Sequence, residues 1–347
     1  MTVAFVLHLL IPLLIIFLCF SSFTKERETQ TLPLLLSQGV SMRQLFWGKV
    51  AGYGRALGWL VIPALLLGAG LLFAQTGFQP TADTLARLAL FELIYVVYFG
   101  LVIVGSVYVS ARAAISRSGS SRTSLLALLG VWLLAGVILP RASANLGKSL
   151  FAVPSSFAFQ QQIHDEVKGI DGHNPQSDRA KALEKRILAQ YGADSVSKLP
   201  VNFDGIVMQE GEKYTSLVYQ KHFSALQAQF GRQNSLATWA GFVNPFLAVR
   251  SLSMGLAGTD YAHFVHFKTY AEPYRFGLIE KLNGHMTTFS KTGDWEKTVD
   301  PTFWQQLPDF QYKSPTVGWV LAQHGLSVVA LLFFGLGLVV LVNRALL

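Results

Sequence analysis

The sequence predicts an all-α polytopic membrane protein, in which a helical transmembrane bundle carries a mostly helical extracytoplasmic domain between its last two spans. Three observations lead to this prediction. The 347 residues are 51% hydrophobic and only 14% charged, whereas a soluble domain of this length carries about 25% charged residues. Five apolar segments have the length of a membrane span, and the basic residues between them gather on one side. So few charges leave too little polar surface to cover a water-exposed globule.

The five segments run over residues 3–23, 57–74, 88–109, 123–139 and 317–342, and the fourth can extend to 144. A bilayer core requires about 20 apolar residues of helix, which each of them approaches or exceeds. The first segment lacks the marks of a cleaved signal peptide, because no basic residue precedes it and a charged cluster follows it. We therefore predict a transmembrane region over 1–144, an extracytoplasmic domain over 145–316, and a last span with a cytoplasmic C-terminus over 317–347.

The basic residues orient the spans. Residues 145–316 hold 17 Lys+Arg against 16 Asp+Glu, so the formal charge of +8 comes almost wholly from the apolar remainder. In that remainder nine basic residues lie on one side of an alternating topology, namely Lys25, Arg27, Arg43, Lys49, Arg55, Arg112, Arg117, Arg122 and Arg344. Excess positive charge between spans marks cytoplasmic loops, and it argues against nucleic acid as a partner. Segment 145–316 is then expected outside the plasma membrane.

This orientation places the start of the chain outside the membrane and only two residues from the first span. An N-terminus so short and uncharged is a poor start for insertion. We therefore expect a further span upstream of Met1.

The loop between the first two spans, residues 24–49, contains a short apolar helix. Thr31 is the expected N-cap, and Pro33 is tolerated in the first turn. Gln38 and Gly39 are expected to end the helix, and Ser41 to cap the next one. Two interpretations follow from these residues: a docking element for a soluble partner, or an interfacial helix that only anchors the turn.

The same loop resembles the hinge of ABC-2-type permeases, which typically read E-x-E-x-G-T-L-E-x-L-L-x-[ST]-x-P-[VI]-[ST] before a G-K. The matching residues are Glu26, Glu28, Thr31, Leu32, Leu35, Ser37, Val40, Ser41, Gly48 and Lys49. The resemblance implies that Glu26–Ser41 is a coupling helix, which sits in a groove of the ATP-binding subunit. The sequence departs from the pattern at Gln30, where Gly is usual, at Pro33, where Glu is usual, and at Gly39, where Pro is usual.

The region between the last two spans is mainly amphipathic. Helices are expected over 178–191, 214–230 and 260–282, and Pro273 should kink or end the last one. Residues 236–258 are more apolar, but Asn244-Pro245 and Arg250 interrupt them. We expect this segment to pack on the membrane surface or in the domain core and not to cross the bilayer.

Residues 244–275 resemble a group of ABC-2 permeases with large extracytoplasmic loops, the DUF3526 group. These usually read P-x-x-A-[VI]-x-x-x-S-M-x-x-[AS]-G-[TS]-D, then His and A-E-x-Y-R. The matching residues are Pro245, Ala248, Ser253, Met254, Gly258, Thr259, Asp260, His263, Ala271, Glu272, Tyr274 and Arg275. Members of the group commonly carry a span and an outer loop upstream of the hinge. The resemblance implies an architecture and no substrate.

Few residues suggest chemistry on this chain. His263 and His266 are spaced three apart beside Asp260, a spacing that can hold a metal, but no third ligand is identifiable and we predict no metal site. Glu92 lies inside the third span, either as a polar contact in a path or dimer seam or, as we favour, as an interfacial residue. Neither H-E-x-x-H, G-x-S-x-G nor G-x-x-x-x-G-K-[ST] occurs, so we expect no enzymatic activity, no cofactor and no ATP hydrolysis on this chain.

The sequence therefore predicts the permease subunit of an ABC-2-type transporter in a bacterial inner membrane, which couples ATP hydrolysis by a separate chain to export or extraction. The expected partners are two ATPase subunits, a second permease copy or a paralogous permease, membrane lipid, and a periplasmic protein held by the outer domain. The alternative is a non-transporting membrane anchor or signalling subunit, whose outer domain binds a partner.

Overall fold

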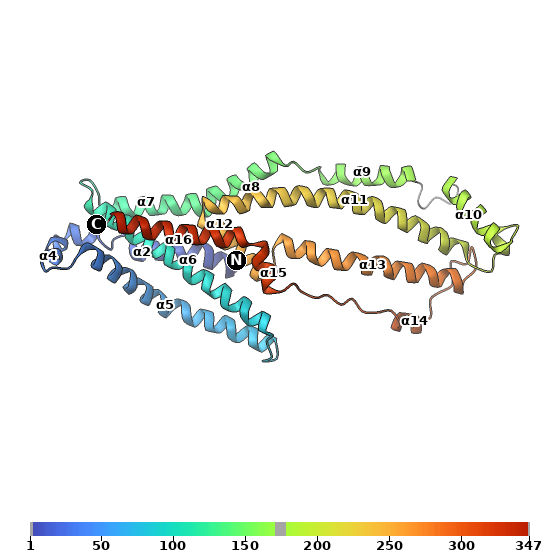
Figure 1. Cartoon of the computed structure of the whole chain (residues 1–347), viewed down its shortest axis with the longest axis horizontal. Helices are drawn as coiled ribbons and strands as arrows, with labels where there is room; N and C mark the ends of the chain where they lie inside the picture. The colour runs from blue at the N-terminus through green and yellow to red at the C-terminus, as the bar shows by residue number, and fades with distance from the viewer. Residues whose placement is uncertain (1–2, 171–177, 346–347) are drawn as a thin grey trace. The chain divides into compact units, whose positions relative to one another are not determined.

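The computed structural model describes residues 3–170 and 178–345, and helices are its only regular secondary structure there (Figure 1). This confirms the predicted all-α class. Its residues form two compact units. The first, the span unit, comprises the chain up to Leu150, Gln233–His263, and the chain from Pro315 onward. The second unit comprises Phe151–Arg232 and Phe264–Ser314.

Among residues 3–170 and 178–345, five helices are long and apolar enough to span a membrane, which agrees with the predicted number of spans. They are Val3–Glu28, Met42–Gln75, Ala82–Ile115, Ser121–Leu150 and Gly325–Arg344. The first contains α1 (Val3–Phe5), η1 (Val6–Leu10), α2 (Ile11–Cys19) and α3 (Thr24–Glu28). The second and third are α5 (Met42–Gln75) and α6 (Ala82–Ile115), and the fourth is α7 (Ser121–Leu133), η2 (Leu134–Ile138) and α8 (Leu139–Leu150).

The helix of the last span begins at Gly325, eight residues after the start of the predicted apolar segment at 317. Residues from Val317 form a separate short helix, α15 (Val317–Gln323), and α16 (Gly325–Ala345) follows it. His324 separates the two helices, and its ring is hydrogen-bonded to Ser251 and to Asp260. These bonds hold the joint in place, a constraint that hydropathy alone does not reveal.

The core of the span unit lies where α6 packs against α2, α5, α12 (Pro245–Leu256) and α16 (Figure 1). Side chains buried there include Ile15, Cys19, Phe46, Tyr95, Phe99, Val107 and Val249. The remaining faces of α5 and α16 carry exposed apolar side chains, such as Trp59, Leu67 and Leu336. Exposed apolar faces of this kind suit contact with lipid.

The apolar segment at 236–258 belongs to the span unit. Its helix α12 begins after Asn244, whose side chain accepts a hydrogen bond from the Phe246 amide. Most of α12 is buried, with Val249 fully covered and Leu252 only 1% exposed. It packs against α6 and α16, so it forms part of the bundle core without being one of the five candidate spans.

A helical region of about 170 residues separates the fourth and fifth spans, as predicted. Its helices are α9 (Ser156–Ile170), α10 (Asp178–Tyr191), η3 (Val196–Lys198), α11 (Phe203–Trp239), η4 (Ala240–Phe242), α12, α13 (Tyr261–Phe289) and α14 (Pro301–Gln305). Pro273 does not end α13, which continues to Phe289. Within the second unit, Leu183, Ile187 and Phe203 form a small buried core.

Candidate functional site: the hinge between the first two spans

The hinge folds as a short helix between two tight turns. After α3, Gln30 takes a left-handed conformation with φ 58°, and α4 (Thr31–Ser37) begins directly after it. Gly39 has φ +85° and starts the second turn. Side chains strain in the left-handed region, whereas glycine enters it freely. The predicted helix, break and second helix are therefore present.

Of the two helix N-caps predicted in the hinge, the structure has one at the predicted residue and the other at its neighbour. Thr31 was expected to cap the helix, but the cap position belongs to Gln30, and the Thr31 hydroxyl donates instead to the carbonyl oxygen of Glu26 at 3.1 Å. Ser41 does cap α5, because its hydroxyl accepts from the Gln44 amide and the Gln44 side chain accepts from the Ser41 amide. A reciprocal capping box of this type fixes where α5 starts.

The leucines of α4 divide into an anchoring and an exposed set. Leu32 is 8% exposed and belongs to the core of the span unit, whereas Leu34 is 61% and Leu36 39% exposed. Leu35 and Val40 are half-buried, and Ser37 is exposed and donates to the Leu34 carbonyl at 2.8 Å. The side chains available to a partner are thus Leu34 and Leu36, two leucines that the motif comparison did not single out.

Glu26 acts within the hinge and does not point to solvent. Its Oε1 is 2.5 Å from Nζ of Lys49, and the two side chains are 25% and 17% exposed. Lys49 also donates to the Ser22 carbonyl at 2.6 Å, and its ammonium lies 5.0 Å from the centre of the Phe23 ring. The pair therefore ties the end of the first span to the second turn of α5.

Glu28 and Arg27 tie the hinge to the loop between α6 and α7. Glu28 accepts hydrogen bonds from the amide and the hydroxyl of Ser121 at 2.7 and 3.0 Å, at the start of α7. Carboxylates at a helix N-terminus are stabilised by its unpaired amides. The Arg27 guanidinium donates to four carbonyls, those of Ala113, Ser116, Arg117 and Gly119.

Arg27 is a residue that sequence reasoning counted only as a cytoplasmic charge. Its carbonyl partners lie 86–92 residues further along the chain, so no local pattern indicates them. Gly119 adds a tight approach there, because a Cβ on it would lie 1.9 Å from the Ala113 carbonyl oxygen. The hinge is thus attached to three spans, the second by Lys49 and the third and fourth by Arg27 and Glu28.

Glu92 is separate from the hinge. It is half-buried on α6, roughly 30 Å along the helix from the residues that Arg27 binds. Within the described chain it makes neither a hydrogen bond nor an ion pair, while the nearby Arg87 pairs with Asp83 at 2.8 Å. Glu92 therefore has no structural role that its contacts reveal, and it does not join the hinge residues in one site.

A second polar cluster lies inside the bundle. His8, in the π-helical turn η1, is 6% exposed, and its ring nitrogens lie 3.1 and 3.4 Å from the hydroxyl of Tyr95. The Tyr95 hydroxyl also meets Ser253 at 3.0 Å, and Tyr98 donates to the His8 carbonyl at 3.2 Å. The sequence showed His8 only as an interruption of an apolar run.

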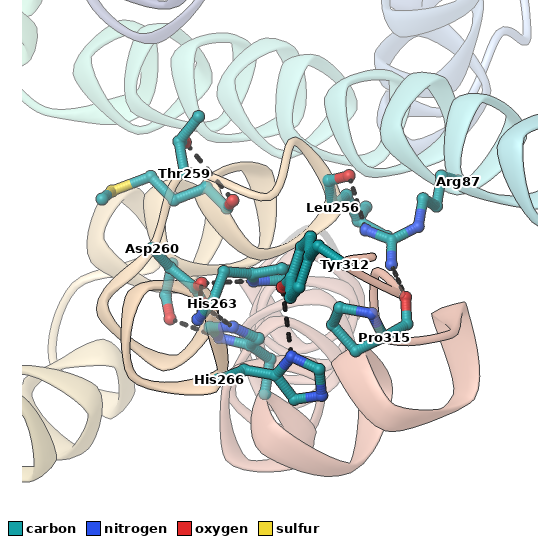
Figure 2. Close-up of polar contacts among 11 residues, drawn as sticks. Arg87, Leu256, Thr259, Asp260, His263, His266, Tyr312 and Pro315 are labelled. Carbon is teal, nitrogen blue, oxygen red and sulfur yellow. Dashed lines mark hydrogen bonds and ion pairs between the residues drawn. The ribbon is translucent and has the colours of Figure 1, made fainter. Parts of the chain in front are cut away.

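His263 and His266, whose spacing could suit a metal, each have a hydrogen-bond partner in the protein. The Nδ1 of His263 lies 2.5 Å from Asp260 in the span unit, and the Nδ1 of His266 lies 3.1 Å from the Tyr312 hydroxyl in the second unit (Figure 2). In the part of the chain that the structure describes, no group of three His, Cys, Asp or Glu side chains is placed to hold a metal ion.

Comparison with known proteins finds a family model that matches part of the chain. Residues 156–313 match the family model described as Domain of unknown function (DUF3526). The matched range contains the whole segment 244–275 on which the resemblance was based, including Asp260 and His263. No curated protein and no solved structure matches the chain. The protein is therefore a multi-span helical membrane protein that carries a DUF3526 domain.

Proposed function

We propose that this protein is the membrane-spanning subunit of an ABC-2-type ABC transporter and that α4 is its coupling helix. The observation that carries the proposal is the division of α4 between Leu32, which is buried in the span unit, and Leu34 and Leu36, which are exposed beside it. A helix of seven residues needs no exposed leucines to connect two spans. Exposed apolar side chains on a rigidly held element suit a protein partner.

The partners follow from what the chain carries. Its sequence contains no G-x-x-x-x-G-K-[ST] loop, so ATP would be hydrolysed on two separate ATPase subunits. A second copy of this chain, or a paralogous permease, would supply the other half of the translocation path. Transport would be export or extraction, and the second unit, residues 151–232 and 264–314, would lie outside the membrane and gate the exit or hold a periplasmic partner.

The hinge contacts suggest how force would pass from the ATPase to the spans. A displacement of α4 acts first on α3 and α5, which the Glu26–Lys49 pair joins. Arg27 and Glu28 then transmit it to the α6–α7 loop through its backbone carbonyls and the Ser121 amide. Such a rigid connection lets closure of the ATPases move several spans together, as in shear and hinge transitions.

The experiment is purification of the full chain with its ATPase in mild detergent, followed by measurement of ATP hydrolysis. We compare wild type with Leu34→Asp plus Leu36→Asp, since both side chains are exposed and their replacement leaves the Leu32 anchor intact. Truncating central apolar contacts of an interface typically weakens binding by tenfold or more. We expect the double variant to fold and to lose the ATPase and its stimulated turnover.

The matched control is Phe78→Asp, in the loop at the other end of α5, where the side chain is 75% exposed. This variant should retain the ATPase. If the α4 variant keeps both the ATPase and transport-linked hydrolysis, α4 is not the coupling element. If no ATPase accompanies wild type, the alternative of a membrane anchor or signalling subunit replaces the transporter.

A further inference from the structure

The span unit contains a chain of four polar side chains, of which Asp260, His263 and His324 are buried and Ser251 is half-buried. The Ser251 hydroxyl lies 2.9 Å from Nδ1 of His324, and Nε2 of His324 lies 2.6 Å from Oδ2 of Asp260. The other oxygen of Asp260 lies 2.5 Å from Nδ1 of His263 and also accepts from the His263 amide at 2.9 Å. These contacts join α12, the start of α13, and the joint between α15 and α16.

The central carboxylate is ionised. Burial on its own would raise the pKa of Asp260, but the hydrogen bonds from His324 and from the amide and ring of His263 outweigh it and hold the pKa below its usual range. The side chain of Asp260 is 8% exposed, and those of the two histidines are each 9% exposed. A buried negative charge is costly unless a positive charge or donors compensate it.

In the described chain, no basic side chain other than histidine pairs with Asp260. The charged groups on α12 and on the first three turns of α6 are Arg250, Asp83, Arg87 and Glu92, and the other charges on α6 and α16, Arg112 and Arg344, lie in the last turns of those helices. Arg87 pairs with Asp83. It also donates hydrogen bonds to the carbonyls of Leu256 and Pro315 (Figure 2). Among the described residues, none of these four charged groups forms a hydrogen bond or ion pair with Asp260 or with its two histidines.

The hydrogen-bond pattern determines the tautomers. An ionised carboxylate only accepts, so Nε2 of His324 and Nδ1 of His263 must both carry protons and donate to Asp260. The free nitrogens are then Nδ1 of His324, which faces the Ser251 hydroxyl, and Nε2 of His263. The latter atom is buried and has no hydrogen-bond partner among the described residues, and its ring meets Trp319 edge-on at 5.2 Å between centroids.

The two free nitrogens differ in their capacity for a further proton. A hydroxyl both donates and accepts, so Ser251 donates to Nδ1 of a neutral His324 and accepts from it after rotation once that nitrogen is protonated. A proton on Nε2 of His263 would instead be a buried donor without an acceptor, which is penalised. One additional proton on His324 also neutralises Asp260.

We propose that Asp260, His263 and His324 form a binding site for a single proton, which is taken up from solvent on Nδ1 of His324 and accepted there by the Ser251 hydroxyl. The proton then sits at the joint that divides the last span from α15. The site depends on a close approach, because a Cβ on Gly255 would lie 2.4 Å from Nε2 of His324. The proposal holds whether or not an ATPase binds α4.

The same residues include a serine, a histidine and an aspartate in hydrogen-bond contact, as in hydrolase triads. A nucleophilic serine also requires free donors for an oxyanion. Ser251 lies in the interior of α12, where the surrounding amides are used within the helix. The arrangement therefore favours proton binding over acyl transfer.

The test is nitrogen NMR of the full chain in nanodiscs, labelled with ¹⁵N-histidine and titrated from about pH 8 to about pH 5, where histidines ordinarily change charge. Spectra of His263→Gln and His324→Gln assign the two rings among the eight histidines. We expect one protonated nitrogen on each ring at high pH, and a second proton on His324 alone at low pH. Double protonation of His263, or of neither ring, would overturn the proposal.

Two serine variants test the role of the hydroxyl. Ser251→Ala removes the acceptor, and we expect the second proton on His324 that wild type carries at about pH 5 to be lost from the spectrum. Ser253→Ala is the matched control on the same helix, because its hydroxyl meets Tyr95; it should retain that proton. Loss of the proton in both variants or in neither, or covalent labelling of Ser251 by a fluorophosphonate, would contradict the assignment.

Discussion

Gln30 shows how one backbone angle explains a departure from a motif. The ABC-2 pattern has glycine at this position, and here glutamine occupies the left-handed region with φ 58° and ψ 16°. The left-handed conformation destabilises a residue with a Cβ by roughly 1–2 kcal/mol. Glycine avoids this strain, but it also raises the conformational entropy of the unfolded chain, which offsets part of the stabilisation. The motif glycine thus has a conformational reason, and it need not contact a partner.

We expect Gln30→Gly to stabilise the protein by about 0.5–1 kcal/mol. The measurement is the midpoint of thermal unfolding of the purified protein in detergent. Gln38→Gly is the matched control at the other end of α4, because Gln38 has an ordinary φ of −79°. That variant should lower the midpoint or leave it unchanged. A gain of the same size at both positions would show that the backbone angle is not the cause.

At the scale of elements, the position of the hinge depends on side chains that donate hydrogen bonds to backbone carbonyls. We expect Arg27→Lys to destabilise the protein by about 2 kcal/mol, since one ammonium cannot replace a guanidinium that donates to four carbonyls. The positive charge is kept, so the membrane orientation should not change. Limited proteolysis of the α6–α7 loop, together with the unfolding midpoint, provides the measurement.

Arg43→Lys serves as the control for that prediction. Arg43 is exposed, lies on the same predicted side of the membrane, and forms no side-chain hydrogen bond or ion pair with the described residues. The exchange should therefore leave both the proteolysis rate and the midpoint unchanged. If Arg27→Lys behaves like Arg43→Lys, the carbonyl contacts do not stabilise the loop.

The elements that sequence predicted well are those set by local chemistry. Hydropathy gave the five spans, Gly39 gave the break in the hinge, and Ser41 gave the start of α5. Thr31 is not the N-cap of α4, because the cap position is taken by Gln30 in the left-handed conformation. This conformation is unfavourable for a residue with a Cβ, so the sequence did not indicate it. The short π-helical turns at Val6–Leu10 and Leu134–Ile138 were not foreseen either, because their apolar residues read as ordinary helix.

The polar clusters were beyond sequence reasoning for a different reason. His324 meets Asp260 across 64 residues, and Tyr95 meets Ser253 across 158. Asp260 and His263 were visible as part of a motif, but His324 lies outside it, within the apolar run 317–342. Only packing of α12 against α6 and α16 brings such partners together, and the Asn244-Pro245 interruption concealed how deeply α12 is buried.

At the scale of the whole molecule, the burial of α12 bears directly on topology. If α12 and its flanks are a buried element that does not cross the bilayer, the α5–α6 loop and residues 264–314 lie on the same side of the membrane. Single cysteines test this. The native Cys19 is 1% exposed and, after its replacement by serine, Gln38→Cys, Gln79→Cys and Glu296→Cys each provide one exposed thiol.

With a membrane-impermeant maleimide on spheroplasts, we expect labelling of Gln79→Cys and Glu296→Cys, and labelling of Gln38→Cys only after permeabilisation. The reason is that positive charge retains the α4 side in the cytoplasm while the far loop of α5 and α6 is translocated. Labelling of Gln38→Cys alone in intact spheroplasts would invert the orientation. Labelling of Gln79→Cys without Glu296→Cys would mean that the chain crosses the membrane once more between these two positions, and residues 236–258 are the apolar stretch of that length there in addition to the third and fourth spans.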